Sequence, residues 1–261
     1  MCAIDFKLPK TPDFINQWCS DHTNGLIKEM IKDIALDARM YVLNALYFKS
    51  DWSDNFRFSN RGTRDANFQK ADGNWIPATM MSQGNRLDYY TDKYLSLVSL
   101  PYGNGVFSMY FLLPERLDSF GEMLAQLKKP NYWNQCLAGK RPTEIDIFIP
   151  RFKVEYEVLP NLNALLGKKG MGIAFTNLAD FSEIAAFPPL RITEVKQKTY
   201  IDVNENGTEA AAVTSVEIGV GMAPPDPKPE FRANRPFLFL IQENSTGTIL
   251  FMGKIGAPKA E

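Results

Sequence analysis

The chain has 261 residues, of which 45% are hydrophobic and 12% are aromatic. That length and apolar content can supply a sizeable core, and we expect one large domain. The 29 Lys and Arg residues nearly balance the 30 Asp and Glu residues, which leaves a formal net charge of −1. This balance argues against a nucleic-acid-binding protein, which normally carries a strong basic excess, and the apolar content argues against a disordered chain.

Few residues are available for metal or redox chemistry. Cys2, Cys19 and Cys136 form no Cys-x-x-Cys pair, so we expect ordinary thiols rather than a disulfide framework. The single histidine, His22, excludes a His-rich metal site, and we expect no cofactor. No run approaches the roughly 20 apolar residues of a membrane-spanning helix, and the first residues lack the pattern of a signal peptide.

The N-terminal part of the sequence predicts two helices and then a strand. The first helix should have Thr11 as its N-cap and Pro12 at its first position, and should end near Asn24–Gly25. A second, short helix is expected over residues 26–34. The nearly continuous apolar run 40–48 is typical of a central strand that is buried on both faces.

The rest of the chain predicts mainly strands, so the fold class is mixed, α+β. Shorter strands should be interrupted at Gly73–Asn74 and Gly84–Asn85. The later predicted elements are a hairpin of strands 95–100 and 106–113, a helix at 117–127, a strand at 144–152, a short helix at 158–166, a strand at 192–203, and a hairpin of strands 237–242 and 249–254. Segment 219–229 holds four of the 17 prolines and should be a long exposed segment.

The sequence offers no apparatus for catalysis, and we expect that the protein is not an enzyme. His22 lies between Asp21 and Thr23 at a predicted helix end, where a polar surface role is expected. The glycine-rich segment 167–172 lacks the Gly-x4-Gly-Lys-[Ser/Thr] order of a phosphate loop, so it is interpreted as a loop that ends a helix.

Segment 203–215 allows two interpretations. It could form an alanine-rich helical turn capped by Thr208. If it is extended instead, alternate side chains point the same way, and one of the two sets is uniformly small: Thr208, Ala210, Ala212 and Thr214. A strand that slips between other strands over a filled core needs such small side chains. The pattern alone does not decide between the two interpretations.

This segment resembles the hinge of the serpins, Glu-x-Gly-Thr-Glu-Ala-Ala-Ala-x-Thr, which begins here at Glu205. The resemblance extends over essentially all of the chain. Asn44 to Trp52 resembles a strand of the family's central sheet, with Ser50 where glycine is usual. Further motifs in the family's order are Ile15-Asn-x-Trp18, Thr63, Phe68, Met80-Met81, Ile149-Pro-Arg-Phe152, Ala179-Asp-Phe-Ser182, Asn234-Arg-Pro-Phe237 and Phe251-Met-Gly-Lys254.

The resemblance implies a single serpin domain over 1–261 with a large central sheet, further sheets, surrounding helices and an exposed reactive loop at about 205–230. It also implies an inhibitor of serine proteases that acts as a suicide substrate. The protease cleaves the loop and becomes acylated, and the freed part of the loop inserts into the main sheet as a new strand. The implied hinge residues are Glu205, Gly207, Thr208, Glu209, Ala210, Ala211, Ala212 and Thr214, and the implied sheet-opening region contains Asn44, Trp52 and Gln197.

By the family's spacing, the cleaved bond lies sixteen residues after Glu205, at Gly221–Met222. Val220–Gly221 and Met222–Ala223 are the alternatives, one residue to either side. These positions are small or apolar, and no Arg or Lys lies between Gly207 and Asp226. We therefore expect an elastase- or subtilisin-like target rather than a trypsin-like protease, and we expect the inhibitor to be a monomer that binds neither nucleic acid nor membranes.

Three features depart from the family's pattern. Gln197 occupies a position that is usually histidine, although its side chain can still donate a hydrogen bond to Asn44. Asn206-Gly-Thr208 is a glycosylation sequon within the inserting segment, and a glycan there would block insertion. This suggests a bacterial or cytosolic source, whereas the family resemblance suggests a secreted, extracellular protein. The match also begins at the helix that crosses the main sheet, so we expect the N-terminal part of the family domain to be absent.

The alternative function is that of a non-inhibitory serpin-fold protein, which binds a ligand or acts like a chaperone. The small side chains at 208, 210, 212 and 214 argue against it, because the resemblance implies that non-inhibitory relatives tend to lose this pattern.

Overall fold

The computed structural model describes residues 3–158, 162–185, 189–208 and 228–259. They belong to two compact units, which we describe separately. Unit 1 contains Met1–Phe48 and Val154–Ile201, and unit 2 contains Lys49–Lys153 and Asp202–Glu261. Within the described residues, no helix is long and apolar enough to cross a membrane. The expectation of one domain over 1–261 stays a prediction.

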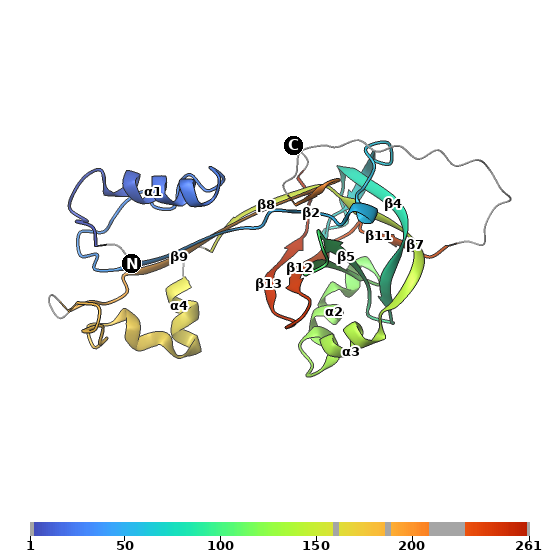
Figure 1. The fold of residues 1–261 in the computed structure, drawn as a ribbon. Helices are drawn as coiled ribbons and strands as arrows, with labels where there is room; N and C mark the ends of the chain where they lie inside the picture. Colours follow the sequence, from blue (N-terminus) through green and yellow to red (C-terminus); the bar gives the residue numbers. More distant parts are fainter. Residues whose placement is uncertain (1–2, 159–161, 186–188, 209–227, 260–261) are drawn as a thin grey trace. The chain divides into compact units, whose positions relative to one another are not determined.

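Unit 1 combines helices with parts of a parallel strand pair (Figure 1). Two of its strands are shared with unit 2 along the chain: β8 begins in unit 2 at Phe152, and β9 ends in unit 2 at Asn204. Its elements are α1 (Thr11–His22), β1 (Tyr41–Tyr47), β8 (Phe152–Glu157), α4 (Leu162–Leu166), the π-helical turn η3 (Gly167–Met171), the 3₁₀ turn η4 (Gly172–Phe175) and β9 (Glu194–Asn204).

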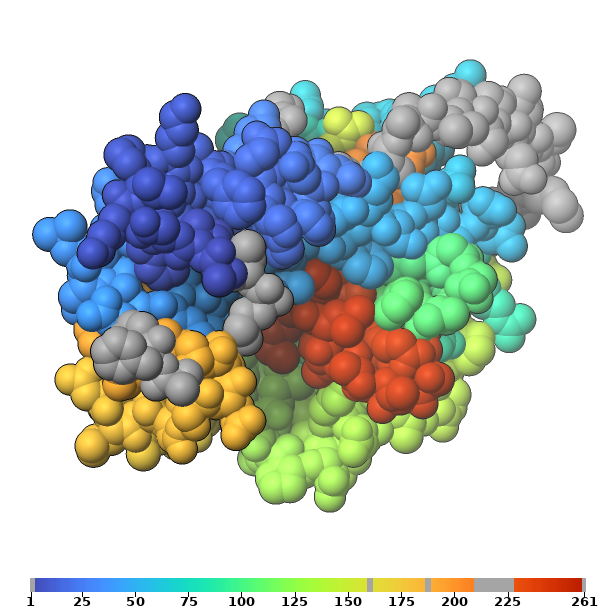
Figure 2. All heavy atoms as spheres, turned by 60° about the vertical axis from the view of Figure 1, so that its left-hand side comes forward, coloured from blue at the N-terminus to red at the C-terminus, as the bar shows by residue number. Residues whose placement is uncertain are grey.

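Helix α1 is confirmed, but its N-cap differs from the prediction. Lys10 is the N-cap and Thr11 is the first helical residue, because the Thr11 hydroxyl donates a hydrogen bond back to the Asp5 carbonyl at 2.6 Å. The helix ends before Asn24 and Gly25, which both have positive φ angles, as expected. Ile15 and Cys19 face a buried cluster with Ile27, Met30, Ile31 and Tyr200. Figure 2 shows the outer side of α1, in dark blue, at the surface.

The predicted helix over 26–34 is wrong. This segment is irregular, and the side chain of Asn16 in α1 binds three of its backbone groups. The Asn16 Oδ1 atom accepts hydrogen bonds from the amides of Met30 and Ile31 at 2.8 and 2.9 Å, and Nδ2 donates to the Ile31 carbonyl at 2.7 Å. Because these bonds satisfy the backbone groups of the buried residues Met30 and Ile31, these residues need no helix to pair them.

The predicted strand at 40–48 is confirmed as β1, but its burial is not. Instead of being buried on both faces, β1 alternates between half-buried and exposed positions, and Val42 is 40% exposed. β1 pairs in parallel with β9, from Tyr41 opposite Glu194 to Tyr47 opposite Tyr200. An apolar run can therefore mark a strand without marking one that is buried on both faces.

Unit 2 is built on an eight-stranded sheet with the order β11-β7-β4-β5-β6-β12-β13, in which β3 also pairs with β4. Except for β11 with β7, the pairs are antiparallel. Its strands are β3 (Arg64–Gln69), β4 (Trp75–Thr91), β5 (Leu95–Tyr102), β6 (Phe107–Pro114), β7 (Arg141–Pro150), β11 (Glu230–Arg232), β12 (Phe237–Glu243) and β13 (Ile249–Ile255). The short elements β2 (Ser50–Asp51), β10 (Gly207–Thr208), η1 (Asp54–Phe56) and η2 (Leu117–Ser119) and the helices α2 (Phe120–Leu127) and α3 (Tyr132–Gly139) complete it.

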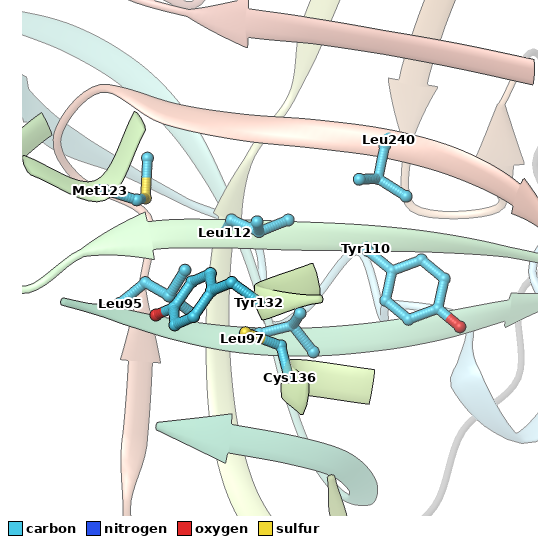
Figure 3. Packing of buried hydrophobic residues seen from close by; sticks show 8 residues of the cluster. All are labelled: Leu95, Leu97, Tyr110, Leu112, Met123, Tyr132, Cys136 and Leu240. Atoms are coloured by element: carbon cyan, nitrogen blue, oxygen red, sulfur yellow. The ribbon is translucent and has the colours of Figure 1, made fainter. Parts of the chain in front are cut away.

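Helices α2 and α3 cover one face of this sheet. Figure 3 shows the buried cluster between these helices and the sheet, to which three strands and both helices contribute. Its members are Leu95, Leu97, Tyr110, Leu112, Met123, Tyr132, Cys136 and Leu240. Both predicted hairpins, β5 with β6 and β12 with β13, are confirmed. Cys19 and Cys136, the two cysteines among the described residues, are buried free thiols, as expected.

The structure differs from the sequence predictions at three further points. β4 is one strand of 17 residues and continues through Gly84–Asn85, because a glycine fits there against Asp146 of the neighbouring strand β7. Helix α3 was not predicted, although it begins directly after Asn131, which has a positive φ. The glycine-rich segment 167–172 is not an open loop, since the helical turns η3 and η4 occupy it; the helical path is interrupted by a kink at Gly170, whose φ is positive.

Candidate functional site

The candidate site is the base of the predicted hinge, residues 205–208, which we call the hinge base. Here β9 turns back on itself through Glu205 and Asn206 and continues as β10. β10 is antiparallel to β9, with Thr208 opposite Val203, and also antiparallel to β2, with Thr208 opposite Ser50. The strand order is therefore β9-β10-β2, so β10, the end of the hinge base, lies between β9 and β2.

Gly207 fits this place because it has no side chain. A Cβ atom there would lie 2.3 Å from the Ser50 carbonyl oxygen, 2.5 Å from the Asp51 Cα and 2.8 Å from the Trp52 amide nitrogen. These are backbone atoms, which cannot move aside as a flexible side chain would. The φ angle of Gly207 is also positive, at 153°. Both observations require glycine at this position.

Trp52 and Tyr102 form the floor beneath β10. Their rings stack with centroids 4.4 Å apart, and both side chains are almost fully buried. Trp52 binds the turn through its backbone amide to the Asn206 carbonyl at 2.8 Å and through its indole Nε1 to the Asn204 carbonyl at 3.0 Å. The Tyr102 hydroxyl lies 2.7 Å from the Thr208 Oγ1 atom, so the buried threonine has a polar partner.

Glu205 holds the turn from the other side with a buried carboxylate. Arg151 donates to both carboxylate oxygens, with Nε at 2.9 Å from each and with its terminal nitrogen 2.6 Å from Oε1. Thr63 donates its hydroxyl to the same Oε1 at 2.5 Å, and the Glu205 carbonyl accepts from the Phe58 amide at 2.9 Å. These contacts come from two segments that are far apart in sequence, residues 58–63 and Arg151.

The electrostatics favour the ionised form of Glu205. Burial by itself raises the pKa of this carboxyl, but the hydrogen bonds from Arg151 and Thr63 outweigh burial, so the pKa lies below its ordinary value. At Tyr102 burial prevails, and the pKa of its phenol is raised. At neutral pH, Glu205 in the hinge base is therefore charged, and the neighbouring Tyr102 is neutral.

The predicted sheet-opening residues lie in both units. Asn44 in β1 and Gln197 in β9 are register partners in unit 1, and Trp52 contacts the hinge base in unit 2. β9 thus changes neighbour along its length. Its first seven residues pair with β1, and Val203 and Asn204 pair with β10.

Only part of the predicted site falls within the described residues. Glu205, Gly207 and Thr208 are described, and Gly207 and Thr208 are extended rather than helical. The remaining hinge residues and the predicted bond lie outside them: Glu209, Ala210, Ala211, Ala212, Thr214, Val220, Gly221, Met222 and Ala223.

Sequence reasoning assigned no role to Arg151, Thr63 or Tyr102. Arg151 and Thr63 belong to motifs that carried the family resemblance, so a signal for them existed. Tyr102 lies in the turn of a predicted hairpin, where its contact with Thr208 had no sequence signal.

The described residues also bear on the other candidate chemistries. The His22 ring is exposed, lies 2.8 Å from the Trp18 carbonyl through Nδ1 and stacks on the Trp18 ring, which is the surface role expected of it. Among the described residues, no cluster of three or more His, Cys, Asp or Glu side chains could hold a metal ion.

Comparison with known proteins identifies the fold and the family. Residues 1–258 match the family model "Serpin (serine protease inhibitor)", and the chain belongs to the serpin family. Serpin-Z1C of Triticum aestivum is 32% identical over 98% of this chain, and Serpin B11 of Homo sapiens is 33% identical over 98%; each alignment covers 66% of the relative. The chain thus spans about two thirds of the length of the curated relatives it matches.

Solved structures agree with this assignment. The native state of tengpin, a thermophilic serpin, is similar with a TM-score of 0.84 and 29% identity, over 96% of this chain and 64% of that one. A complex of human thyroxine-binding globulin with thyroxine is similar with a TM-score of 0.86 and 25% identity, over 99% of this chain and 67% of that one. The mixed α and β architecture is therefore that of a serpin.

Proposed function

We propose that the protein inhibits a serine protease as a suicide substrate and traps the acylated protease by inserting its cleaved loop between β1 and β9. The observation that carries this proposal is the place of β10. Gly207 and Thr208 already lie between β9 and β2, so the segment that follows them needs only to continue along β9.

Continued insertion would have to separate β1 from β9. The two strands are paired from Tyr47 and Tyr200 back to Tyr41 and Glu194. A strand inserted there gains ladder hydrogen bonds on both sides, each worth about 0.5–1.5 kcal/mol net. Beyond Thr208, the alternating small side chains Ala210, Ala212 and Thr214 suit a strand that must pass over a filled core.

We propose Gly221–Met222 as the cleaved bond, with Val220–Gly221 and Met222–Ala223 as the alternatives. Small and apolar residues on both sides favour a protease with an apolar specificity pocket, of the elastase or subtilisin kind. A trypsin-like target is disfavoured because no basic residue lies between Gly207 and Asp226.

The test is to mix the chain with an elastase-like protease and with trypsin. The expected result is a covalent complex with the first protease that survives denaturant on a gel. The released C-terminal peptide, identified by mass spectrometry, should begin at Met222. Cleavage of the loop without a stable complex would refute the inhibitory function, and a peptide that begins elsewhere would refute the assigned bond.

A non-inhibitory binding function is the second candidate, and one observation in unit 2 favours it. A cavity of about 490 Å³ is lined by Arg86, Lys140, Asn244 and Gln242, among other residues. The buried Oε1 of Gln242 has no hydrogen-bond partner among the described residues. A solved relative, thyroxine-binding globulin, holds thyroxine. Saturable binding of a small aromatic acid, together with no protease complex, would favour this function.

A further inference from the structure

The hinge base contains an Asn–Gly pair, Asn206–Gly207, which is one of three in the chain. In such a pair the backbone nitrogen of the glycine can attack the side-chain amide of the asparagine. Glycine permits this attack better than other residues, because it has no Cβ to obstruct the approach and its backbone reaches more conformations. Asparagine is for this reason one of the thermolabile residues of proteins.

The other two pairs are protected by hydrogen bonds. The Asn24 side chain donates to the Tyr47 hydroxyl at 3.0 Å, and the Gly25 amide donates to the Ser20 carbonyl at 2.8 Å. The Asn104 side chain accepts from the Val106 amide at 3.3 Å, and the Gly105 amide donates to the Tyr102 carbonyl at 2.7 Å. In both pairs the side-chain amide and the attacking nitrogen are held.

Asn206 differs in its side chain. Its amide group forms no hydrogen bond to any described residue and is partly exposed to solvent. Only its backbone is held, since the Asn206 amide donates to the Asn204 Oδ1 at 3.0 Å and the carbonyl accepts from Trp52. The reacting amide is therefore free to turn toward Gly207 whenever the strand pairing of β10 loosens.

We propose that Asn206–Gly207 is a self-modification site, at which the hinge base slowly loses ammonia. The deprotonated nitrogen of Gly207 attacks the Asn206 Cγ, a new N–Cγ bond forms, and the Cγ–Nδ2 bond breaks with release of ammonia. Water then opens the succinimide ring at either carbonyl. One product has aspartate at 206, and the other has isoaspartate, whose main chain runs through the former side chain.

The hinge base has no room for the isoaspartyl product. That product adds a methylene group to the main chain directly before Gly207, which already approaches the backbone of Ser50 and Asp51 too closely for a Cβ atom. It also turns the carbonyl that accepts from Trp52 into part of a carboxylate branch. Either product places a second negative charge beside Glu205, whose carboxylate already binds Arg151. The modified hinge base therefore pairs more weakly with β2.

Pairing of β10 should control the rate of the reaction. The hydroxyl contact between Thr208 and Tyr102 helps to hold Gly207 in the strand. Removal of either hydroxyl, in Thr208→Ala or Tyr102→Phe, should loosen β10 and accelerate the loss of ammonia. This dependence would make the modification a record of how long the hinge base has been open.

The experiment is to incubate the chain in a mildly alkaline buffer and follow its peptides by mass spectrometry, with enzymatic methylation to mark isoaspartate. The peptide that contains residue 206 should convert first, ahead of those that contain Asn24 and Asn104. Thr208→Ala and Tyr102→Phe should convert at 206 several-fold faster. Asn206→Gln is the matched control, since its longer side chain closes the ring far more slowly, and it should show no product there.

The product's effect is measured on the modified protein, separated by ion exchange through its extra negative charge. It should unfold at a lower temperature than unmodified protein. The proposal fails if Asn206 stays intact while Asn24 or Asn104 converts, or if it stays intact under conditions that convert a synthetic peptide of the same sequence. It also fails if isoaspartyl protein unfolds at the unmodified temperature. None of these measurements depends on protease inhibition.

Discussion

Glu205 stabilises the folded hinge base only while its carboxylate is ionised. Its pKa in the folded chain is lowered, because the hydrogen bonds from Arg151 and Thr63 outweigh the opposing effect of burial. A group with a lowered pKa contributes its full stability above the ordinary value, here 4.5, and loses it as the pH falls through the folded value. Water screens part of the pair, since the Arg151 side chain is 42% exposed.

Replacing Glu205 with glutamine should therefore lower the free energy of unfolding by about 1–3 kcal/mol at neutral pH. The variant keeps the shape of the side chain but loses the charge-assisted hydrogen bonds with Arg151. Urea unfolding of both proteins at several pH values is the measurement. The difference between them should shrink below pH 4.5, where the wild-type carboxylate also becomes protonated. A difference that does not change with pH would contradict this account.

A second prediction at the residue scale concerns Gly207. Gly207→Ala should lower the free energy of unfolding by about 1–3 kcal/mol, because the added methyl group overlaps the backbone of Ser50 and Asp51. Gly73→Ala is the matched control, since Gly73 also has a positive φ but has nothing within 4 Å of the added atom. Denaturant unfolding of both variants separates the overlap from the backbone strain. Equal losses would mean that strain alone requires glycine at 207.

At the scale of elements, the Asn16 side chain holds the segment 26–34, for which a helix was predicted, in an irregular conformation. Asn16→Ala should lower the free energy of unfolding by about 2–3 kcal/mol, because it leaves the amides of Met30 and Ile31 and a carbonyl without their partner. Amide hydrogen exchange at residues 30 and 31 should accelerate with it. Gln17→Ala, which removes only an exposed hydrogen bond to Asp21, should change neither quantity. Unchanged exchange in Asn16→Ala would show that packing alone holds this segment.

The sequence pattern predicted secondary-structure elements correctly where the local signal and the tertiary contacts favour the same conformation. The turn at 103–105 and the apolar strands beside it gave a correct hairpin, because turn chemistry and alternation both act within a few residues. The helix prediction for 26–34 is wrong because the conformation of this segment depends on Asn16, a residue outside it. The prediction of a break at Gly84 in β4 is wrong because glycine there leaves room for the Asp146 side chain of the neighbouring strand and does not form a turn.

The candidate site was predictable along the hinge segment and at Trp52, but not at its other partners. The hinge pattern located Glu205, Gly207 and Thr208, which are consecutive or nearly so. Their partners Thr63, Tyr102 and Arg151 come from three different segments. No spacing rule in one sequence relates residues that meet only after a sheet has formed, so the buried ion pair and the tyrosine contact required the structure.

At the scale of the whole molecule, the proposed function requires the native chain to hold unused strand-pairing capacity. β9 pairs with β1 over seven residues, and an inserted strand would exchange that one ladder for two. The net gain is one ladder of about the same length. At about 0.5–1.5 kcal/mol for each hydrogen bond, a ladder of about seven residues would contribute roughly 4–10 kcal/mol. The uncleaved protein would then be less stable than its own cleaved form.

Cleavage within the loop should accordingly raise the thermal unfolding temperature of the chain, although it breaks a covalent bond. Scanning calorimetry before and after limited proteolysis measures this shift. Ala210→Pro is the decisive variant, because proline cannot donate to a ladder in the interior of a sheet. Cleaved Ala210→Pro should gain much less stability, and with the target protease it should act as a substrate instead of forming a complex. A covalent complex formed at undiminished yield by Ala210→Pro would refute strand insertion, whatever the calorimetry shows.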